Sequence, residues 1–257
     1  MSSGLPPGRI QSVSRALVLL NLVAERTVEN SGTSLARAAG LAVPTAHHLL
    51  ATLAAHGLVT RDDGGGYVLG PAVAALANAY HREMSPPAYL LGPLRQLVTQ
   101  TGETGYLAAW RRGEIVMLAS VDGGLPVRVS VPTGPYRDAH ARASGKLLLA
   151  LSDDDQRASY LSAHPVRAVT PHTVTAGRRL AHQFATIRKE GIAIDQEEFQ
   201  DGVSCLAAPV LHRDVLVASY ALSVPTERFR ARRAHLTAAL LAAAGSATGS
   251  APLEVAR

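Results

Sequence analysis

The chain has 257 residues, 47% of them hydrophobic, and a formal net charge of +5 at pH 7. This length fits one large domain or two ordinary ones, and the charge permits an anionic partner without demanding one. A single cysteine, Cys205, excludes an intrachain disulfide and fits a reducing cytosol, so we expect a cytoplasmic protein. No apolar run reaches the roughly 18 to 20 residues of a membrane span, so no membrane partner is expected.

The N-terminus combines a polar arm with an apolar segment. Residues 1–11 are rich in Ser, Gly and Pro, which is typical of a mobile arm. The segment 12–25 resembles a signal peptide, because arginines accompany an apolar run. We favour a helix instead, because Val13, Leu17 and Leu20 share one helical face and the following helices need a neighbour to complete their core.

The segment 33–69 predicts a helix, a short turn, a longer helix and a hairpin. Thr33 can cap the first helix, and Gly40 ends it because glycine accepts a left-handed backbone. Pro44 suits the first position of the second helix, whose leucines recur at spacings of three and four. Gly57 ends that second helix.

Two short strands are predicted at 58–61 and 67–69, around an Asp-Asp-Gly-Gly-Gly turn. Helix, turn, helix and β-wing together form the outline of a winged helix-turn-helix, which usually places its second helix in the DNA major groove. The alternative is a helical pair that does not bind DNA. Charge does not decide between them, because residues 1–80 carry five arginines against four acidic residues.

The exposed start of the second helix holds the side chains that can contact base edges or phosphates. In the alternative interpretation, its two histidines are solvated surface residues. Arginines at the edges of the helices and the wing are candidates for phosphate contacts, although each could be an ordinary solvated side chain. The candidate DNA-binding residues are Arg15, Arg37, Thr45, His47, His48 and Arg61.

The remainder of the chain predicts a second domain. Residues 71–80 predict a linker helix, and Met-Ser-Pro-Pro at 84–87 breaks it at a domain boundary. Helices are then expected at 89–101, 144–151, from 153 onward, 177–189 and 228–244. Strands are expected at 104–110, 114–121, 127–131, 192–195, 206–211 and 215–223. Because strands and helices do not alternate in regular βαβ units, we expect an α+β fold with a mainly antiparallel sheet.

Three segments carry patterns that occur together in one family. The first is the winged helix-turn-helix. The second, 132–150, contains His-Ala-x-x-x-Gly-Lys from His140 to Lys146. The third, 191–210, contains Glu-Glu-x-x-x-Gly-x-x-Cys-x-Ala-Ala-Pro-Val. In this order and at this spacing, the sequence resembles the IclR family of transcriptional regulators over residues 10–245.

The resemblance implies a transcription factor that binds double-stranded operator DNA and is controlled by a small organic metabolite. It also implies a GAF-like effector domain and assembly as a homodimer or as a homotetramer built from two dimers. The resemblance also favours a repressor over an activator. The expected parts are a winged helix-turn-helix at 10–72, a linker helix at 73–87, an effector-binding and oligomerisation domain at 88–245, and a flexible tail at 246–257. The alternative is a metabolite-binding module or an enzyme that has lost DNA binding.

The resemblance also implies where the effector binds. Family ligands lie between the sheet and the start of a helix, here at 143–145, where backbone N–H groups suit a carboxylate. The positions that match family ligand contacts are Pro126, Ala143, Ser144, Asp195, Cys205, Ala221 and Ser223. Judged without the resemblance, Cys205 is a small buried apolar residue. The pocket could be small and polar, or it could be lined by Tyr106, Leu107, Trp110 and Met117.

Several positions depart from the family pattern. Val43 and His48 stand where a basic residue and an arginine are usual, which predicts weaker base readout. Ala143 stands where members that bind small acids have Gly, and Ala221 where they have Ser. Both changes argue against simple transfer of a glyoxylate-like ligand. Asp138 replaces a common Pro, which leaves the conformation of the loop before the second pattern open.

Catalysis is not indicated by the sequence. There is no Gly-rich phosphate loop and no Gly-x-Ser-x-Gly motif, and the histidines of the second domain lack metal-ligand spacing, so neither cofactor nor metal is expected. Cys205 and His140 could be imagined as nucleophile and base, but no third group that would orient them is evident. Lys146 and the pair at 197–198 are expected to be structural or interface residues.

Overall fold

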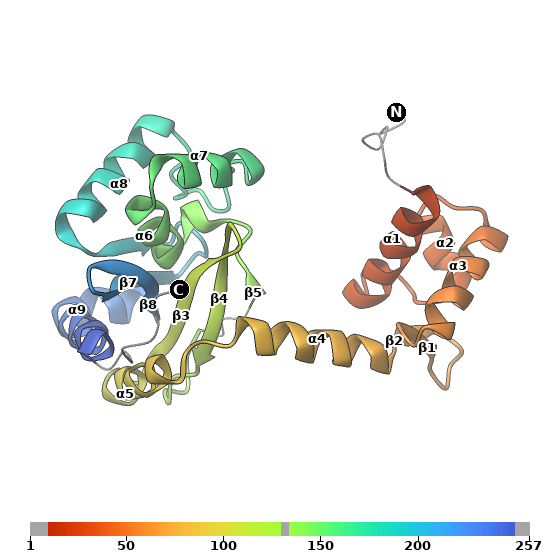
Figure 1. Ribbon diagram of the computed structural model, residues 1–257, viewed down its shortest axis with the longest axis horizontal. Coiled ribbons are helices and arrows are strands. Elements are labelled where there is room, and N and C mark those ends of the chain that lie inside the picture. The colour runs from red at the N-terminus through yellow and green to blue at the C-terminus, as the bar shows by residue number, and fades with distance from the viewer. Residues whose placement is uncertain (1–9, 130–133, 250–257) are drawn as a thin grey trace. The chain divides into compact units, whose positions relative to one another are not determined.

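The computed structural model describes residues 10–129 and 134–249, and the chain divides into two compact units, Met1–Glu83 and Met84–Arg257 (Figure 1). Most of the arm expected at 1–11 lies outside the described residues. Within the described ranges, no single helix has the length and hydropathy to cross a bilayer; only the bent pair of Gly32–Ala38 and Val43–Ala55, at 110°, meets those limits together.

The N-terminal unit has the order of elements that the sequence predicts. It runs through α1 (Gln11–Glu25), α2 (Gly32–Ala38), α3 (Val43–Ala55), β1 (Val59–Arg61), β2 (Tyr67–Leu69) and α4 (Pro71–Met84). β1 and β2 pair antiparallel to form the wing. The three helices and the wing share one core, made of Leu19, Val23, Leu35, Ala36, Ala46, Leu50, Leu53, Val59 and Tyr67. The winged helix-turn-helix is therefore confirmed.

The start of α2 differs from the prediction. Ser31, not Thr33, is the N-cap, and the Ser31 hydroxyl accepts a hydrogen bond from the backbone N–H of Ser34 at 3.3 Å. Thr33 lies inside the first turn with its side chain exposed. Gly40 and Gly57 have φ angles of +64° and +66°, which fits the predicted role of glycine just beyond the two helices.

The C-terminal unit contains a six-stranded antiparallel sheet in the order β5-β4-β3-β8-β7-β6. Its strands are β3 (Thr104–Arg111), β4 (Glu114–Val121), β5 (Gly134–Pro135), β6 (Ala193–Gln196), β7 (Val203–His212) and β8 (Val215–Pro225). Arg112 and Gly113 have positive φ angles and make the hairpin turn between β3 and β4. The α+β class and the antiparallel sheet are therefore confirmed.

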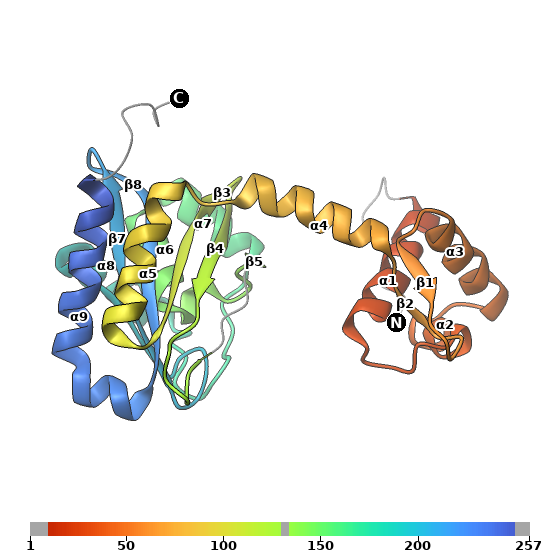
Figure 2. The same cartoon turned by 90° about the horizontal axis from the view of Figure 1, so that it is seen from below.

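Helices cover both faces of this sheet (Figure 2). The helices of the unit are η1 (Ala88–Leu90), α5 (Leu91–Thr101), η2 (Ala139–Ala141), α6 (Ala143–Leu151), α7 (Asp154–Ala163), α8 (Gly177–Glu190) and α9 (Thr226–Gly249). α5 and α9 pack on one face, and α6 and α8 pack on the other. Because side chains alternate along a strand, Tyr106 belongs to the α6 side and Leu107 to the α9 side. Leu107 therefore does not join Tyr106 in lining the expected pocket.

Two expected segments differ in the structure. Residues 127–129 of the strand expected at 127–131 are not in a strand, and 130–131 lie outside the described residues. The edge of β4 pairs with Gly134–Pro135 instead, and the carbonyl of Val127 accepts a hydrogen bond from Arg228. The last helix continues to Gly249, so the first residues of the tail expected at 246–257 are helical. Residues 250–257 are outside the described range.

Candidate functional site

In the N-terminal unit, α3 buries one side and exposes the other. Ala46, Leu50 and Leu53 are buried in the core, whereas His47 and His48 are exposed. Thr45, the third candidate on this helix, is half-buried. The start of α3 therefore offers the two imidazoles to an external partner, as the DNA-binding prediction requires.

The side chain of His47 lies close to the backbone of α2. A Cβ atom added to Gly32, in the first turn of α2, would lie 2.8 Å from Cε1 of His47. The imidazole therefore lies against the start of α2, and a larger residue at Gly32 would displace it. This contact could not be predicted from the sequence, because it joins two helices across the turn.

The three candidate arginines occupy three different elements of the same unit. Arg61 on β1 stacks over the ring of Tyr67 at 5.0 Å and donates a hydrogen bond to its hydroxyl at 3.1 Å. Arg37 is exposed in the last turn of α2, and Arg15 is half-buried on α1. Tyr67 thus orients the wing arginine, a detail that spacing alone could not predict.

In the C-terminal unit, three of the candidate ligand residues form one row across neighbouring strands. Asp195 on β6 lies opposite Cys205 on β7, and Cys205 lies opposite Ser223 on β8. All three side chains are buried, and the Cys205 sulfur lies 3.1 Å from the Ser223 hydroxyl. Two positions that the resemblance assigns to ligand contact, Cys205 and Ser223, therefore lie on neighbouring strands.

The start of α6 brings further polar groups to the same side of the sheet. Ser144 is fully buried, and its hydroxyl lies 2.8 Å from the hydroxyl of Tyr136. Ala143 is also buried, and Ala221 lies opposite Tyr106 in the sheet. We call the group of Tyr106, Tyr136, Ser144, Asp195, Cys205 and Ser223 the buried polar cluster.

Burial sets the protonation of this cluster. It raises the pKa of Asp195 to about 7, although the nearby Lys146 charge acts in the opposite direction. The Asp195 carboxyl also accepts the backbone N–H of Glu198 at 2.7 Å. Burial likewise raises the pKa of the Cys205 thiol to about 12. The thiol therefore stays protonated at neutral pH, which removes the nucleophile that a Cys205–His140 pair would need. His140 instead bonds to the carbonyl of Arg167 at 2.9 Å.

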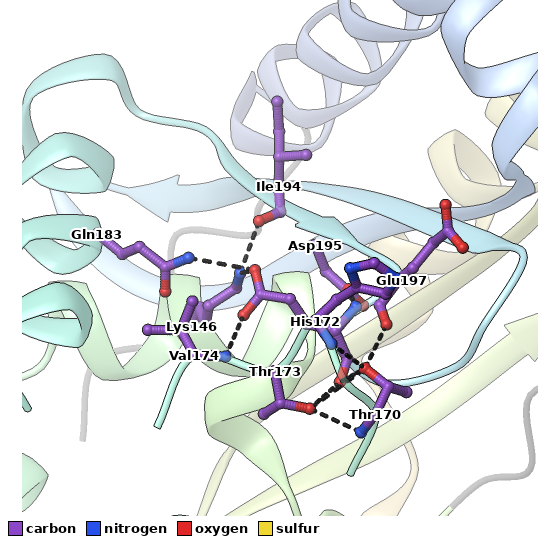
Figure 3. Close-up of polar contacts among 10 residues, drawn as sticks. Lys146, Thr170, His172, Thr173, Val174, Gln183, Ile194, Asp195 and Glu197 are labelled. Atoms are coloured by element: carbon purple, nitrogen blue, oxygen red, sulfur yellow. Dashed lines mark hydrogen bonds and ion pairs between the residues drawn. The ribbon is translucent and has the colours of Figure 1, made fainter. Parts of the chain in front are cut away.

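A buried ion pair lies next to the cluster. The Lys146 ammonium on α6 contacts the Ile194 carbonyl at 2.7 Å (Figure 3). It also contacts the Glu198 carboxylate at 2.5 Å. Glu198 also accepts hydrogen bonds from the Gln183 side chain and the Val174 backbone. The pair therefore ties α6 to β6, α8 and the segment before α8, which agrees with the expectation of a structural role.

Two further positions from the sequence have different surroundings. Asp138, which replaces a common Pro, accepts two hydrogen bonds from Arg167 at 2.8 and 2.9 Å, and this contact lowers the pKa of its carboxyl. The loop therefore has its own anchor in place of the proline. Pro126 is exposed after β4, and no hydrogen bond or ring contact among the described residues joins it to the buried polar cluster.

Sequence reasoning missed Arg142, the residue before α6. Its guanidinium carbon lies 3.4 Å from the ring centre of Phe199 and 4.8 Å from that of Tyr136. It occupies a variable position of the second sequence pattern, so the pattern itself gave no reason to select it. Its charge and its location beside a predicted ligand site were the only available signal.

Histidine spacing predicts no metal site, but the fold brings together one group that the spacing could not reveal. Ligand atoms of His172, Glu197 and Asp201 lie within 4.8 Å of one another near the surface. Glu197 is already engaged, because its carboxylate accepts the Gly202 N–H at 2.9 Å and lies 3.7 Å from Arg230. We assign no role to this group.

The chain matches two family models that together cover both units. Residues 12–63 match the IclR helix-turn-helix domain, and residues 88–248 match the bacterial transcriptional regulator IclR C-terminal domain. The chain is 31% identical to the HTH-type transcriptional regulator XynR of Escherichia coli over 221 residues, which are 85% of this chain and 88% of that protein. It is 30% identical to the transcriptional repressor IclR of Escherichia coli, over 86% of this chain and 82% of that protein.

Solved structures show the same fold. A putative transcriptional regulator from a Rhodococcus species superposes with a TM-score of 0.74 at 26% identity, over 94% of this chain and 98% of that one. An IclR homologue from Microbacterium hydrocarbonoxydans, solved in complex with 4-hydroxybenzoate, superposes with a TM-score of 0.72 at 21% identity, over 93% and 98%. The relatives that match this chain are transcriptional regulators and not enzymes. The chain belongs to the IclR family of DNA-binding transcriptional regulators.

Proposed function

We propose that this regulator is a repressor that binds operator DNA through α3 and releases it when a small organic metabolite binds beside α6. The observation that carries the DNA half is the orientation of α3, whose apolar side is buried while His47 and His48 face outward. Base edges and phosphates both accept hydrogen bonds from imidazole N–H groups. Arg15, Arg37 and Arg61 supply phosphate contacts in this proposal. Such a regulator acts on the cytoplasmic chromosome.

The protein acts as a homodimer or as a dimer of dimers in this proposal. Exposed apolar side chains on the DNA-binding unit support self-association: Ile10, Val13 and Leu17 are 68%, 53% and 53% exposed, and Leu76 on α4 is 62% exposed. A two-fold dimer presents two copies of α3 to one DNA duplex. The operator is therefore expected to be a pseudo-palindrome.

The effector binds between the sheet and the start of α6 in this proposal. Support comes from the buried polar cluster, because hydroxyl, thiol and carboxyl groups gathered there can hydrogen-bond a ligand. The Microbacterium homologue was solved with 4-hydroxybenzoate, which makes an aromatic acid a reasonable first ligand to try. Effector binding must favour one spacing of the two α3 helices over another, because a ligand shifts an equilibrium only through differential affinity.

The first experiment is a gel shift with the DNA upstream of the chain's own gene. Wild-type protein is expected to give a specific shift that weakens steeply with salt. The double variant Thr45→Ala plus His47→Ala is expected to lose the shift. The same two changes in the other unit, Thr99→Ala plus His182→Ala, serve as the matched control and should leave it intact.

The alternative, a metabolite-binding protein that has lost DNA binding, rests on one observation. Val43 and His48 are exposed at positions where the family usually carries charge, so α3 offers less charge to DNA. Absence of a shift with any genomic fragment, with and without metabolites, would support this alternative. A shift that both double variants retain would place DNA binding elsewhere than the start of α3.

A further inference from the structure

We propose that Arg142 binds the anionic group of the effector, so that this regulator responds to an organic anion and not to a neutral metabolite. The inference rests on the effector binding proposed above and names the chemical class that the site selects. It is carried by the surroundings of one side chain that the sequence patterns did not select.

Two aromatic rings hold the Arg142 guanidinium. Phe199 lies 3.4 Å from it and Tyr136 lies 4.8 Å from it, measured from the guanidinium carbon to each ring centre. Cation–π contacts of this kind use the faces of the rings and none of the guanidinium N–H donors. These donors have the fork geometry that matches a carboxylate.

Arg142 lacks the ion pair that three other cations of the same unit possess. Lys146 pairs with Glu198, Arg157 with Asp154, and Arg228 with Glu103. Arg142 is half-buried, and among the described residues it has no carboxylate within ion-pair distance. Its Nε atom is buried and has no hydrogen-bond partner. A partly buried cation without a counter-ion is costly, and an anionic ligand would remove that cost.

The neighbouring carboxyl does not take the role of counter-ion. Asp195 accepts the Glu198 backbone N–H at 2.7 Å, and burial holds the pKa of its carboxyl near 7, so a large share of it is uncharged at neutral pH. The Arg142 charge instead lowers the pKa values of Tyr106, Tyr136 and Cys205, against the larger effect of burial. The guanidinium therefore lies beside the buried polar cluster.

The start of α6 strengthens the preference for an anion. Arg142 is the N-cap of α6, and its side chain makes no capping hydrogen bond. Free backbone N–H groups at a helix start favour negative charge. An effector carboxylate at Arg142 would leave the rest of the molecule next to the hydroxyls of Tyr136 and Ser144, which are 2.8 Å apart.

The first test compares Arg142→Met with Arg228→Met in the full chain without ligand. Methionine keeps a long side chain between the two rings but removes the charge. We expect the melting temperature of Arg142→Met to equal or exceed that of the wild type, because an unpaired charge is lost. Arg228→Met should lower it, because Glu103 is fully buried and loses its closest partner. A clear fall for Arg142→Met would overturn the proposal by showing that the arginine is structural.

The second test uses charged and uncharged probes of the same shape. Pyruvate, benzoate and 4-hydroxybenzoate are each compared with the corresponding amide by their shift of the melting temperature. We expect the acids to act at least tenfold more tightly than the amides on the wild type, and to lose that advantage in Arg142→Met. Amides that act as well as the acids, or an unaffected variant, would overturn the proposal. If no probe shifts the melting temperature of the wild type, the melting temperatures of Arg142→Met and Arg228→Met without ligand decide whether the proposal stands.

Failure of this inference can be told apart from failure of the proposed function. If a neutral metabolite releases the protein from DNA in a specific gel shift, the proposed repressor function is supported and only the role of Arg142 is overturned. Absence of any gel shift, together with Arg142-dependent binding of acids, would overturn DNA binding while the anion site remained.

Discussion

The two units assemble their functional side chains in different ways. The candidate DNA-reading residues of α3 lie within four consecutive positions, and a single helix presents them. The buried polar cluster draws its members from β3, β6, β7, β8, α6 and the segment before it, which are separated by up to about half of the chain. A local pattern can therefore specify the first site, whereas only the whole sheet can specify the second.

The largest effect on stability is expected in the C-terminal unit, when its buried ion pair is broken. In Lys146→Met, Glu198 keeps its burial but loses its cation. The free energy of unfolding is expected to fall by about 3–5 kcal/mol. Urea unfolding followed by fluorescence reports on this unit alone, because Trp110 is the only tryptophan. Lys146→Met plus Glu198→Gln should recover most of the loss, and a double variant no better than the single one would contradict the pairing.

The pH dependence of stability should also differ between sites. The pKa of Asp195 is raised from 3.8 to about 7 in the folded state, so the folded protein binds the extra proton between these values. Its contribution to stability is full below about pH 4 and is lost as pH rises to 7, on the order of a few kcal/mol. Urea midpoints measured from pH 4 to 8 should show this slope in the wild type and not in Asp195→Asn.

Asp138 provides the control with the opposite sign. The Arg167 hydrogen bonds lower the pKa of Asp138, so its contribution is present above its usual value and is lost as pH falls. Asp138→Asn should therefore lose stability at neutral pH and converge with the wild type in acid. Equal slopes in both variants would show that neither carboxyl is perturbed as the structure indicates.

A smaller effect, confined to the first unit, is expected from Gly32→Ala. The added Cβ would lie 2.8 Å from His47, so the imidazole must move aside. We expect DNA affinity to fall by about tenfold, the size of one good base contact, while the melting temperature stays or rises because alanine favours a helix. Gly92→Ala in α5, where a Cβ meets nothing within 4 Å, is the matched control for gel shifts and melting. Unchanged affinity would remove His47 from the contact surface.

The smallest expected change concerns the wing. Arg61→Ala should weaken DNA binding similarly for all sequences and reduce the slope of log affinity against log salt by about 1. The control is Arg95→Ala on α5, which should leave the slope unchanged. A loss of sequence preference in Arg61→Ala would mean that this arginine reads bases.

The same contrast explains what the sequence could predict. The helices, the wing and the strands with strong alternation follow from periodicity and from glycine positions, as at Gly40 and Gly57. The N-cap of α2 is Ser31 and not Thr33. The two are both good capping residues and lie only two positions apart, so the sequence does not distinguish them. Residues 127–129 are not in a strand, and the Val127 carbonyl instead accepts a hydrogen bond from Arg228, which lies 101 positions away.

The candidate sites divide in the same way. The grouping of Cys205 with Ser223 could be predicted from the family resemblance, which assigns both positions to ligand contact. The stacking of Arg142 between Tyr136 and Phe199 could not, because it depends on two loops that meet only in the folded chain. The contact of His47 with Gly32 was hidden for the same reason.

The state of Cys205 makes the chain convenient for spectroscopy. It is the only cysteine, and burial keeps it as a protonated thiol that reagents for thiolates attack slowly. A cysteine introduced at an exposed position of α3 would then be the single reactive thiol of the native protein. A spin label attached there would report the separation of the two recognition helices in an oligomer, with and without effector, on a chain that needs no other change.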